Sequence, residues 1–214
     1  MIKIKRFIFN PLQVNCFVLS NEAKEGIIVD CACLEPSEQQ QVEQYLQAEG
    51  IRLVRCLQTH MHFDHVMGLG WLQRYAGIQA ECHVADLEIY ATAAQRASEW
   101  VGIELGALPP ARTLPMTGNE LLLPFGESAI KVLFTPGHTP GGVCYYLEEN
   151  KALLSGDTLF RFSVGRTDLP GGDYPTLVHS IRTQLLTLPP ETTVYPGHGP
   201  KTSIAVEQHN PYVI

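Results

Sequence analysis

The sequence predicts an α/β fold in which two sheets pack face to face with helices outside. Two observations support this: each half of the 214-residue chain begins with short apolar strands, and each then continues into amphipathic helices. The segment 102–118 is rich in glycine and proline and is the expected joint between the halves. We therefore expect a single domain over residues 1–214, built from two pseudo-symmetric halves whose sequences are too dissimilar to establish a repeat.

The first half is expected to begin as a meander of short strands. Turn-forming residues such as Asn10 and Gly26 separate its first apolar runs. A helix follows Pro36, with Val42 and Leu46 at helical spacing, and Gly50 ends it. The expected strands are residues 2–9, 14–19, 26–30, the run that ends at His60, and 79–84. The other expected helices are residues 63–75, which Gly77 closes, and 86–101.

The second half repeats this order of elements. Its expected strands are residues 121–123, 129–134, 143–147, 152–154 and 192–195. Asp173 is expected to cap a helix that carries Pro175 in its first turn. The apolar face of this helix is expected to hold Tyr174, Leu177, Val178, Ile181 and Leu185.

Composition limits the possible functions. The chain is 45 % apolar and 17 % charged, which is ordinary for a globular enzyme. Its formal net charge of −7 argues against a nucleic-acid partner, because such proteins present a basic surface. No stretch approaches about 18 apolar residues and the N-terminus has no apolar signal segment, so we expect a cytoplasmic protein with no membrane contact. The six cysteines are expected to be reduced and buried, and the close pair Cys31 and Cys33 is a weak candidate for ligation.

The segment from Thr59 to His65 carries the strongest functional signal. Its candidate ligands are His60, His62, Asp64 and His65, which follow directly after an apolar run. Neutral imidazole is the commonest metal ligand, whereas a protein core has no need for this density of histidine. In a strand-to-helix turn, His60 and His62 can face one way while Asp64 and His65 face another. One segment can therefore serve two ions.

Three further candidate ligands, His138, Asp157 and His198, each follow an apolar strand. Both histidines come after Pro-Gly, whose backbone angles make a tight turn that presents the imidazole at the end of the strand. The seven side chains exceed what one tetrahedral ion uses and suit two divalent ions that share Asp157 and a bridging water or hydroxide. Zinc is the expected metal, and iron or manganese also fit nitrogen and oxygen ligands.

Other polar residues are expected to support these ligands or to play no part. Asp30, Thr59 and Ser155 can orient imidazole rings through hydrogen bonds. The histidines expected to be structural or exposed are His83, His179 and His209.

Four motifs occur in order along the chain: Thr-His-Met-His-Phe-Asp-His, Pro-Gly-His-Thr-Pro-Gly, Ser-Gly-Asp-Thr-Leu-Phe and Pro-Gly-His-Gly. Together they resemble the metallo-β-lactamase superfamily, and within it the glyoxalase II-like hydrolases. Residues 165–172 and the tail 202–211 are similar to the small members of that type. The resemblance implies a four-layer αβ/βα sandwich. It also implies that the first ion is held by His60, His62 and His138, the second by Asp64, His65 and His198, with Asp157 shared.

The resemblance implies a metal-dependent hydrolase of a small thioester such as S-lactoylglutathione. A metal-bridging hydroxide would attack the thioester, and Asp64 would orient it or carry its proton. Arg161, Arg166 and Lys201 flank the metal-bearing turns and are candidates to pair a substrate carboxylate, with surface solvation as the alternative. Full-length glyoxalase II resembles this chain plus a helical C-terminal domain with basic groups for glutathione. We expect a small-molecule thioester as partner. The sequence does not determine which thiol carries the acyl group.

Other functions are compatible with the same motifs. The persulfide dioxygenase branch of the superfamily uses one iron held by two histidines and a carboxylate. It ranks second because Phe63 and residues 66–68 look more like the hydrolases. A β-lactamase is disfavoured because nothing indicates secretion, and a superfamily ribonuclease because the chain has no basic surface. A metal-binding protein whose site has lost its activity is the non-enzyme alternative. The sequence predicts no oligomeric state.

Overall fold

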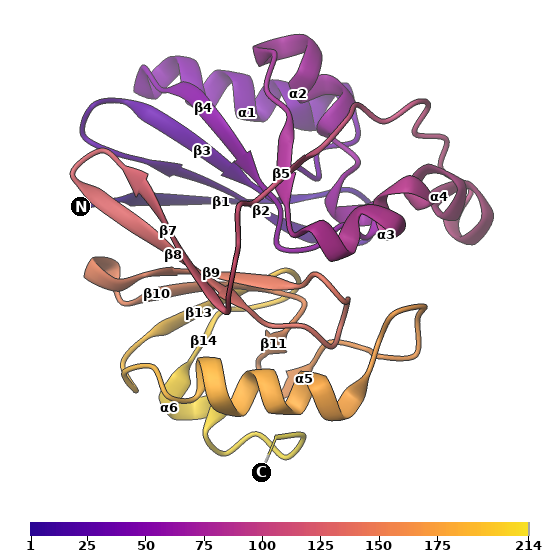
Figure 1. The fold of residues 1–214 in the computed structure, drawn as a ribbon. Helices are drawn as coiled ribbons and strands as arrows, with labels where there is room; N and C mark the ends of the chain where they lie inside the picture. The colour runs from indigo at the N-terminus through magenta and orange to yellow at the C-terminus, as the bar shows by residue number, and fades with distance from the viewer. Residues whose placement is uncertain (214) are drawn as a thin grey trace. The chain divides into compact units, whose positions relative to one another are not determined.

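The computed structural model describes residues 1–213, which form two compact units with a boundary between Leu114 and Pro115. This boundary lies inside the segment 102–118. The N-terminal unit (residues 2–114) and the C-terminal unit (residues 115–213) each contain one six-stranded mixed sheet (Figure 1). Within the described residues, no helix combines the length and the hydropathy that crossing a bilayer requires.

The N-terminal sheet begins as the expected meander and then becomes parallel. In order across the sheet, its strands are β1 (Lys3–Phe9), β2 (Val14–Ser20), β3 (Glu25–Val29), β4 (Arg52–Leu57), β5 (Ala80–Cys82) and β6 (Arg112–Thr113). The first three pair antiparallel, and β3 to β6 pair parallel. Parallel strands end at the same edge of a sheet. The residues that follow β3 and β4, including Asp30 and Thr59, are therefore neighbours.

Four α-helices belong to the N-terminal unit: α1 (Pro36–Glu49), α2 (Leu69–Ala76), α3 (Leu87–Ala91) and α4 (Ala93–Val101). In Figure 1, α1 and α2 cover one face of the sheet. The carboxylate of Glu38 accepts hydrogen bonds from the Leu34 and Glu35 amides, which fixes the start of α1. Gly50 ends the helix with a φ of 66°. The predicted boundaries of α1 are confirmed.

The predicted helix over residues 63–75 is interrupted. A 3₁₀ turn over Phe63–His65 precedes α2, and the chain turns between them at Gly68. The Gly68 amide donates to the Cys31 carbonyl at 2.8 Å, and a Cβ at Gly68 would lie 2.8 Å from that oxygen and from the Cys33 sulfur. This close approach to the segment after β3 overrides the helical periodicity, so the prediction of one continuous helix is wrong.

The predicted helix over residues 86–101 is also divided. The break falls at Thr92, between α3 and α4, where the Thr92 hydroxyl donates to the Ile89 carbonyl at 3.1 Å. A threonine side chain that bonds back to the preceding turn competes with the helical ladder and bends it. The short strand β6 lies in the segment 102–118, which the sequence predicts as the joint between the halves.

The C-terminal sheet has the order β14-β13-β10-β9-β8-β7. Its strands are β7 (Glu120–Phe125), β8 (Ser128–Phe134), β9 (Val143–Leu147), β10 (Ala152–Gly156), β13 (Thr193–Pro196) and β14 (Thr202–Ser203). β10 and β13 pair parallel, so both deliver their carboxyl ends to one edge of the sheet. Asp157 and His198 follow these two strand ends. A separate hairpin is formed by β11 (Leu159–Phe160) and β12 (Ser163–Val164).

Two helices pack on the C-terminal sheet: α5 (Tyr174–Ser180), which continues as a π-helical turn over Ile181–Leu185, and α6 (Ile204–Glu207). The Asp173 carboxylate accepts the Thr176 amide at 2.9 Å, as expected for an N-cap. Of the predicted apolar face, Leu177, Ile181 and Leu185 are buried in the core of this unit. Tyr174 is 44 % exposed and Val178 is partly buried, so the buried face is narrower than predicted.

Candidate metal centre

In the N-terminal unit, four candidate ligands lie in the turn that follows β4. The imidazoles of His60, His62 and His65 are buried, with exposed fractions of 2 %, 5 % and 0 %. The ring centroids of His60 and His62 are 4.9 Å apart, and those of His60 and His65 are 4.1 Å apart. Asp64 Oδ2 lies 3.7 Å from His65 Nε2. The structure therefore gathers these four predicted ligands into one cluster, in which the imidazoles are buried and Asp64 is partly buried.

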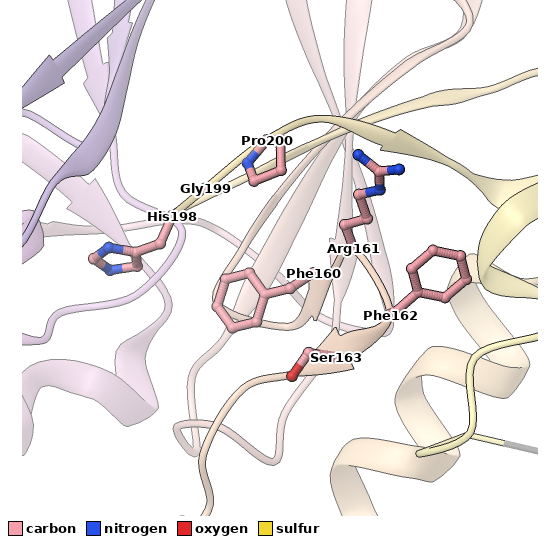
Figure 2. A pocket seen from close by; sticks show the side chains of 7 residues that line it. All are labelled: Phe160, Arg161, Phe162, Ser163, His198, Gly199 and Pro200. Atoms are coloured by element: carbon pink, nitrogen blue, oxygen red, sulfur yellow. The ribbon is translucent and has the colours of Figure 1, made fainter.

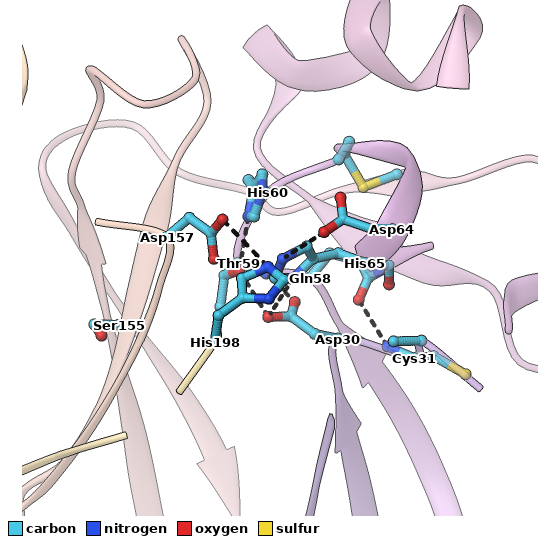
Figure 3. Close-up of polar contacts among 12 residues, drawn as sticks. Asp30, Cys31, Gln58, Thr59, His60, Asp64, His65, Ser155, Asp157 and His198 are labelled. Atoms are coloured by element: carbon cyan, nitrogen blue, oxygen red, sulfur yellow. Dashed lines mark hydrogen bonds and ion pairs between the residues drawn. The ribbon is translucent and has the colours of Figure 1, made fainter. Parts of the chain in front are cut away.

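Asp30 contacts the His65 imidazole directly and reaches the His60 imidazole through Thr59 (Figure 3). Its carboxylate accepts the Thr59 amide at 2.7 Å and the Thr59 hydroxyl at 2.8 Å. The same carboxylate lies 3.1 Å from His65 Nδ1, and the Thr59 hydroxyl lies 3.1 Å from His60 Nδ1. Because these contacts use the Nδ1 atoms, Nε2 is the nitrogen of each ring that can act as a metal ligand. The supporting role predicted for Asp30 and Thr59 is confirmed by these contacts.

Three buried polar residues that were not predicted to belong to the site hold the backbone of this turn. The Asn10 side chain donates to the Asp64 carbonyl at 3.0 Å, and the Gln58 side chain donates to the His65 carbonyl at 3.0 Å. Asp86, which is fully buried, accepts the Met61 amide at 3.0 Å. Their partners are far along the chain or on the backbone, so local sequence patterns give little sign of them.

In the C-terminal unit, the structure brings His138, Asp157 and His198 together. Asp157 Oδ2 lies 3.7 Å from His138 Nε2 and 3.6 Å from His198 Nε2. Two atoms that each lie about 2.1 Å from one tetrahedral ion are about 3.4 Å apart. The observed separations are therefore close to those of ligand atoms around shared ions, and they are longer than hydrogen bonds.

The loop before Thr167 fixes His138 through its backbone. The Nδ1 atom of His138 lies 2.7 Å from the Arg166 carbonyl oxygen, so Nδ1 is the donor and Nε2 is the nitrogen available as a ligand. Gly165 makes this approach possible, because a Cβ there would lie 1.8 Å from the Asp157 carbonyl oxygen and 3.0 Å from His138 Nδ1. The sequence indicates Arg166 only by its charge and gives no sign of this role of its carbonyl group.

The Pro-Gly turn before His138 also depends on glycine. Gly137 has a φ of 134°, and a Cβ at this position would lie 2.3 Å from the backbone of Leu177 in α5. Its amide donates to the Thr139 carbonyl at 2.9 Å, which closes the turn. The predicted turn that presents His138 at the strand's end is therefore seen, and it is locked against α5.

The three candidate substrate-binding residues have different surroundings. The Arg166 guanidinium forms two hydrogen bonds of 2.7 Å with Asp168, and this pair holds the pKa of the Asp168 carboxyl at about 2. Arg161 is exposed, and its guanidinium lies 6.0 Å from the centre of the Phe162 ring. Lys201 is also exposed.

Ser155, which was predicted to orient an imidazole, instead donates to the Leu159 carbonyl at 2.8 Å and so supports the turn that carries Asp157. His179 and His209 are exposed and His83 is partly buried, as expected of histidines outside the site. All six cysteines are free and buried. Burial raises the pKa of the Cys31 thiol well above its usual value, which opposes the thiolate form that a metal ligand needs.

Comparison with known proteins places these features in a family. The sequence matches the metallo-β-lactamase superfamily over residues 9–198. The probable metallo-hydrolase YqgX of Bacillus subtilis (strain 168) is 35 % identical over 99 % of this chain and 98 % of that protein. The hydroxyacylglutathione hydrolase GloC of Haemophilus influenzae is 32 % identical over 94 % of this chain and 93 % of that protein. The human mitochondrial persulfide dioxygenase ETHE1 is 28 % identical over 90 % of this chain and 67 % of that protein.

Solved structures agree with the sequence match. A B3 metallo-β-lactamase, BLEG-1, superposes with a TM-score of 0.86 at 34 % identity over 99 % of both chains. TTHA1623, in a di-iron-bound form, superposes with a TM-score of 0.85 at 36 % identity over 97 % of this chain and 99 % of that chain. The predicted α/β fold of the metallo-β-lactamase type is confirmed. The chain belongs to the metallo-β-lactamase superfamily.

Proposed function

We propose that this protein is a dinuclear metal hydrolase that cleaves a small thioester. The observation that carries the proposal is the position of Asp157 Oδ2, which lies at a ligand-to-ligand distance from both His138 and His198. One carboxylate oxygen beside two histidines is the arrangement expected of a residue shared by two ions. From the four sequence motifs, we propose His60, His62, His138 and Asp157 as the ligands of the first ion, and Asp64, His65, His198 and Asp157 as those of the second.

The donor set fits divalent ions of the first transition row. It consists of imidazole rings together with carboxylate oxygens, and Nδ1 of three rings, those of His60, His65 and His138, is already engaged. Such ligands suit zinc or iron. We propose zinc as the metal, with iron as the alternative because a similar protein, TTHA1623, has been solved in a di-iron-bound form. When bound, the ions supply two effects: they lower the pKa of water and they polarise a substrate carbonyl.

The protein's own residues hold the reacting groups. Asp30 and Thr59 fix the rings of His60 and His65, so little reorganisation accompanies the reaction. Asp64 is partly buried beside His65, where its carboxylate can orient the nucleophile and accept its proton. We propose Asp64 as the catalytic carboxylate.

The proposed substrate is a hydroxyacyl thioester. The similarity to GloC, which is described as a hydroxyacylglutathione hydrolase, supports this class. For the anionic groups of the substrate we propose Arg161 first, because Arg166 is engaged by Asp168. Lys201 is a further candidate, since it is exposed and follows the turn of His198.

A persulfide dioxygenase is the second candidate. It is favoured by the 28 % identity to human ETHE1, and it would need one iron in place of two ions. The hydrolase ranks first because the chain supplies a full second set of ligands in Asp64, His65 and His198.

The decisive test uses protein purified without chelator. Metal content per chain is measured alongside hydrolysis of S-lactoylglutathione, followed by loss of the thioester absorbance. Two ions per chain with metal-dependent turnover, abolished in Asp64→Ala, support the hydrolase. One iron per chain, no thioester cleavage and oxygen uptake with glutathione persulfide would support the dioxygenase instead. Turnover of a β-lactam without thioester cleavage would favour the activity for which BLEG-1 is described.

A further inference from the structure

The hairpin of β11 and β12 lines a hollow beside the candidate ligand His198. Phe160, Arg161 and Phe162 form one side of this hollow of 340 Å³, and the segment from His198 to Pro200 forms the other (Figure 2). The rings of Phe160 and His198 meet edge to face, with centroids 6.4 Å apart. The position of the hairpin therefore determines the shape of the hollow next to His198.

This hairpin needs support from outside. Each of its strands has two residues, and within the described chain they pair only with each other. A two-stranded hairpin is marginally stable alone. Its tip carries further strain, because Phe162 has a φ of 54°, a left-handed conformation that bulky residues rarely adopt.

Glu207 at the end of α6 supplies that support. Its side chain is fully buried, and its two carboxylate oxygens both accept the Phe162 amide, at 3.1 and 3.2 Å. The Thr202 hydroxyl donates to the same carboxylate at 2.7 Å, and the Asn210 side chain donates at 2.8 Å. Asn210 also donates to the Ser163 carbonyl at 3.1 Å. One buried acid thus connects the chain's last helix and tail to the strained tip of the hairpin.

A structural role in the tail alone does not require this acid. Removing a carboxylate from water is costly, and apolar residues of similar volume often give equal or greater stability in its place. Only a hydrogen-bond acceptor, however, can bind the Phe162 amide and so hold this residue in its left-handed conformation. The segment from Thr202 to Asn210 has no other part in the proposed chemistry. Its function is therefore to hold the hairpin in place.

We propose that Glu207 is a positioning residue that fixes the β11–β12 hairpin, and so sets the affinity of the hollow beside His198 for a carboxylate-bearing part of the thioester. The proposal rests on the proposed hydrolase for its kinetic readout. The hollow has aromatic walls and one guanidinium, that of Arg161, which suits a short chain ending in a carboxylate. Glu207 acts through the hairpin and does not itself contact the substrate.

The test compares Glu207→Gln with Glu191→Gln. Glutamine keeps the shape of the side chain but replaces one of the two oxygens that accept the Phe162 amide with an amide donor. Glu191 is an exposed acid in the same unit that pairs with Lys151, so it is a matched control. In Glu207→Gln, we expect KM for the thioester to rise about ten-fold, with kcat and metal content near those of the wild type. Hydrogen exchange of the Phe162 amide should also accelerate, while exchange in α5 stays unchanged.

The outcomes separate this inference from the proposed function. A wild-type protein that cleaves no thioester contradicts the proposed hydrolase. In that case, hydrogen exchange of the Phe162 amide in Glu207→Gln still tests the positioning role of Glu207. A variant that loses thermal stability but keeps the wild-type KM and the wild-type Phe162 exchange overturns the inference. If Glu207→Gln does not fold, Thr202→Val replaces it: a smaller increase in KM and in Phe162 exchange supports the proposal, and no change in either contradicts it.

Discussion

The two groups of candidate ligands are built in different ways. In the N-terminal unit they come from one continuous turn after β4, and side chains hold them: Asp30 and Thr59 engage the rings of His60 and His65. In the C-terminal unit they come from three separate strand ends, and backbone contacts hold His138. The Arg166 carbonyl engages His138, and Gly165 and Gly137 allow the close approaches that this needs.

This difference predicts which substitutions disturb the geometry of each group of ligands. A group held by side chains loses its geometry when a carboxylate or hydroxyl is replaced. A group held by backbone contacts tolerates side-chain truncation but loses its geometry when a Cβ is added to a glycine. Substitutions in the two groups should therefore differ in their effects on metal binding.

Gly165→Ala should have the largest effect. The new Cβ would lie 1.8 Å from the Asp157 carbonyl oxygen, so the loop or the Asp157 turn must move. We expect a loss of about 1–3 kcal/mol in the free energy of unfolding, by the cost of overpacking, together with loss of metal and activity. Denaturant unfolding and metal analysis measure both quantities.

Gly118→Ala is the matched control, because its φ is not in the left-handed region and a Cβ there meets no atom within 4 Å. It should behave like the wild type. A Gly165→Ala protein that retains wild-type metal content would show that the backbone contacts of the C-terminal group are dispensable.

Asp30→Asn should have the next largest effect. It removes a charged acceptor from the Thr59 amide, the Thr59 hydroxyl and His65. Loss of such support for metal-binding histidines reduces metal affinity about 10–100-fold. Competition with a chelator measures the affinity. Thr59→Ser keeps the hydroxyl and should retain most of the affinity, and equal losses in the two variants would contradict the assigned role of Asp30.

Replacement of Arg166 and Arg161 by alanine should distinguish the role of the Arg166 carbonyl group from the role of an arginine side chain in substrate binding. Arg166→Ala keeps the carbonyl that engages His138 and removes only a guanidinium that is paired with Asp168. We expect wild-type metal content and a change in KM of less than about two-fold, whereas Arg161→Ala should raise KM by about five-fold. Steady-state kinetics on the thioester compare the two. A larger effect of Arg166→Ala on KM would reverse the order proposed for these residues.

The smallest predicted effect concerns pH. The pKa of Asp168 is lowered from 3.8 to about 2, chiefly by its hydrogen bonds with Arg166. Because the pKa is lower in the folded protein, the pair's contribution to stability is complete above pH 3.8 and is lost as the pH falls through about 2. NMR titration of the carboxyl carbon should show a pKa near 2 in the wild type and a return toward 3.8 in Arg166→Ala. An unchanged pKa in the variant would assign the shift to another group.

Much of the fold was predictable because it depends on local patterns. The strands β1 to β3, the helix α1 with its Gly50 end and the Asp173 cap follow from hydrophobic periodicity and turn chemistry. The candidate ligands were identifiable because histidine is rare at this density and each lies just past an apolar strand.

The remaining features depend on contacts that are distant in sequence. The break at Gly68 comes from its packing against Cys31, and the role of Arg166 comes from its carbonyl group. The support given by Asp86 and Glu207 comes from burial next to backbone amides of other segments. Periodicity carries no information about such pairs, so the structure was needed to find them.

The most direct test of the central claim is X-ray absorption spectroscopy at the metal edge on protein purified without chelator. A site shared through Asp157 predicts scattering from a second metal at about 3.5–4 Å, together with nitrogen and oxygen ligands. The same spectrum on Asp157→Asn should lose or weaken the metal–metal feature. A wild-type spectrum with one ion per chain and no metal–metal scattering would contradict the dinuclear centre on which the proposed hydrolase depends.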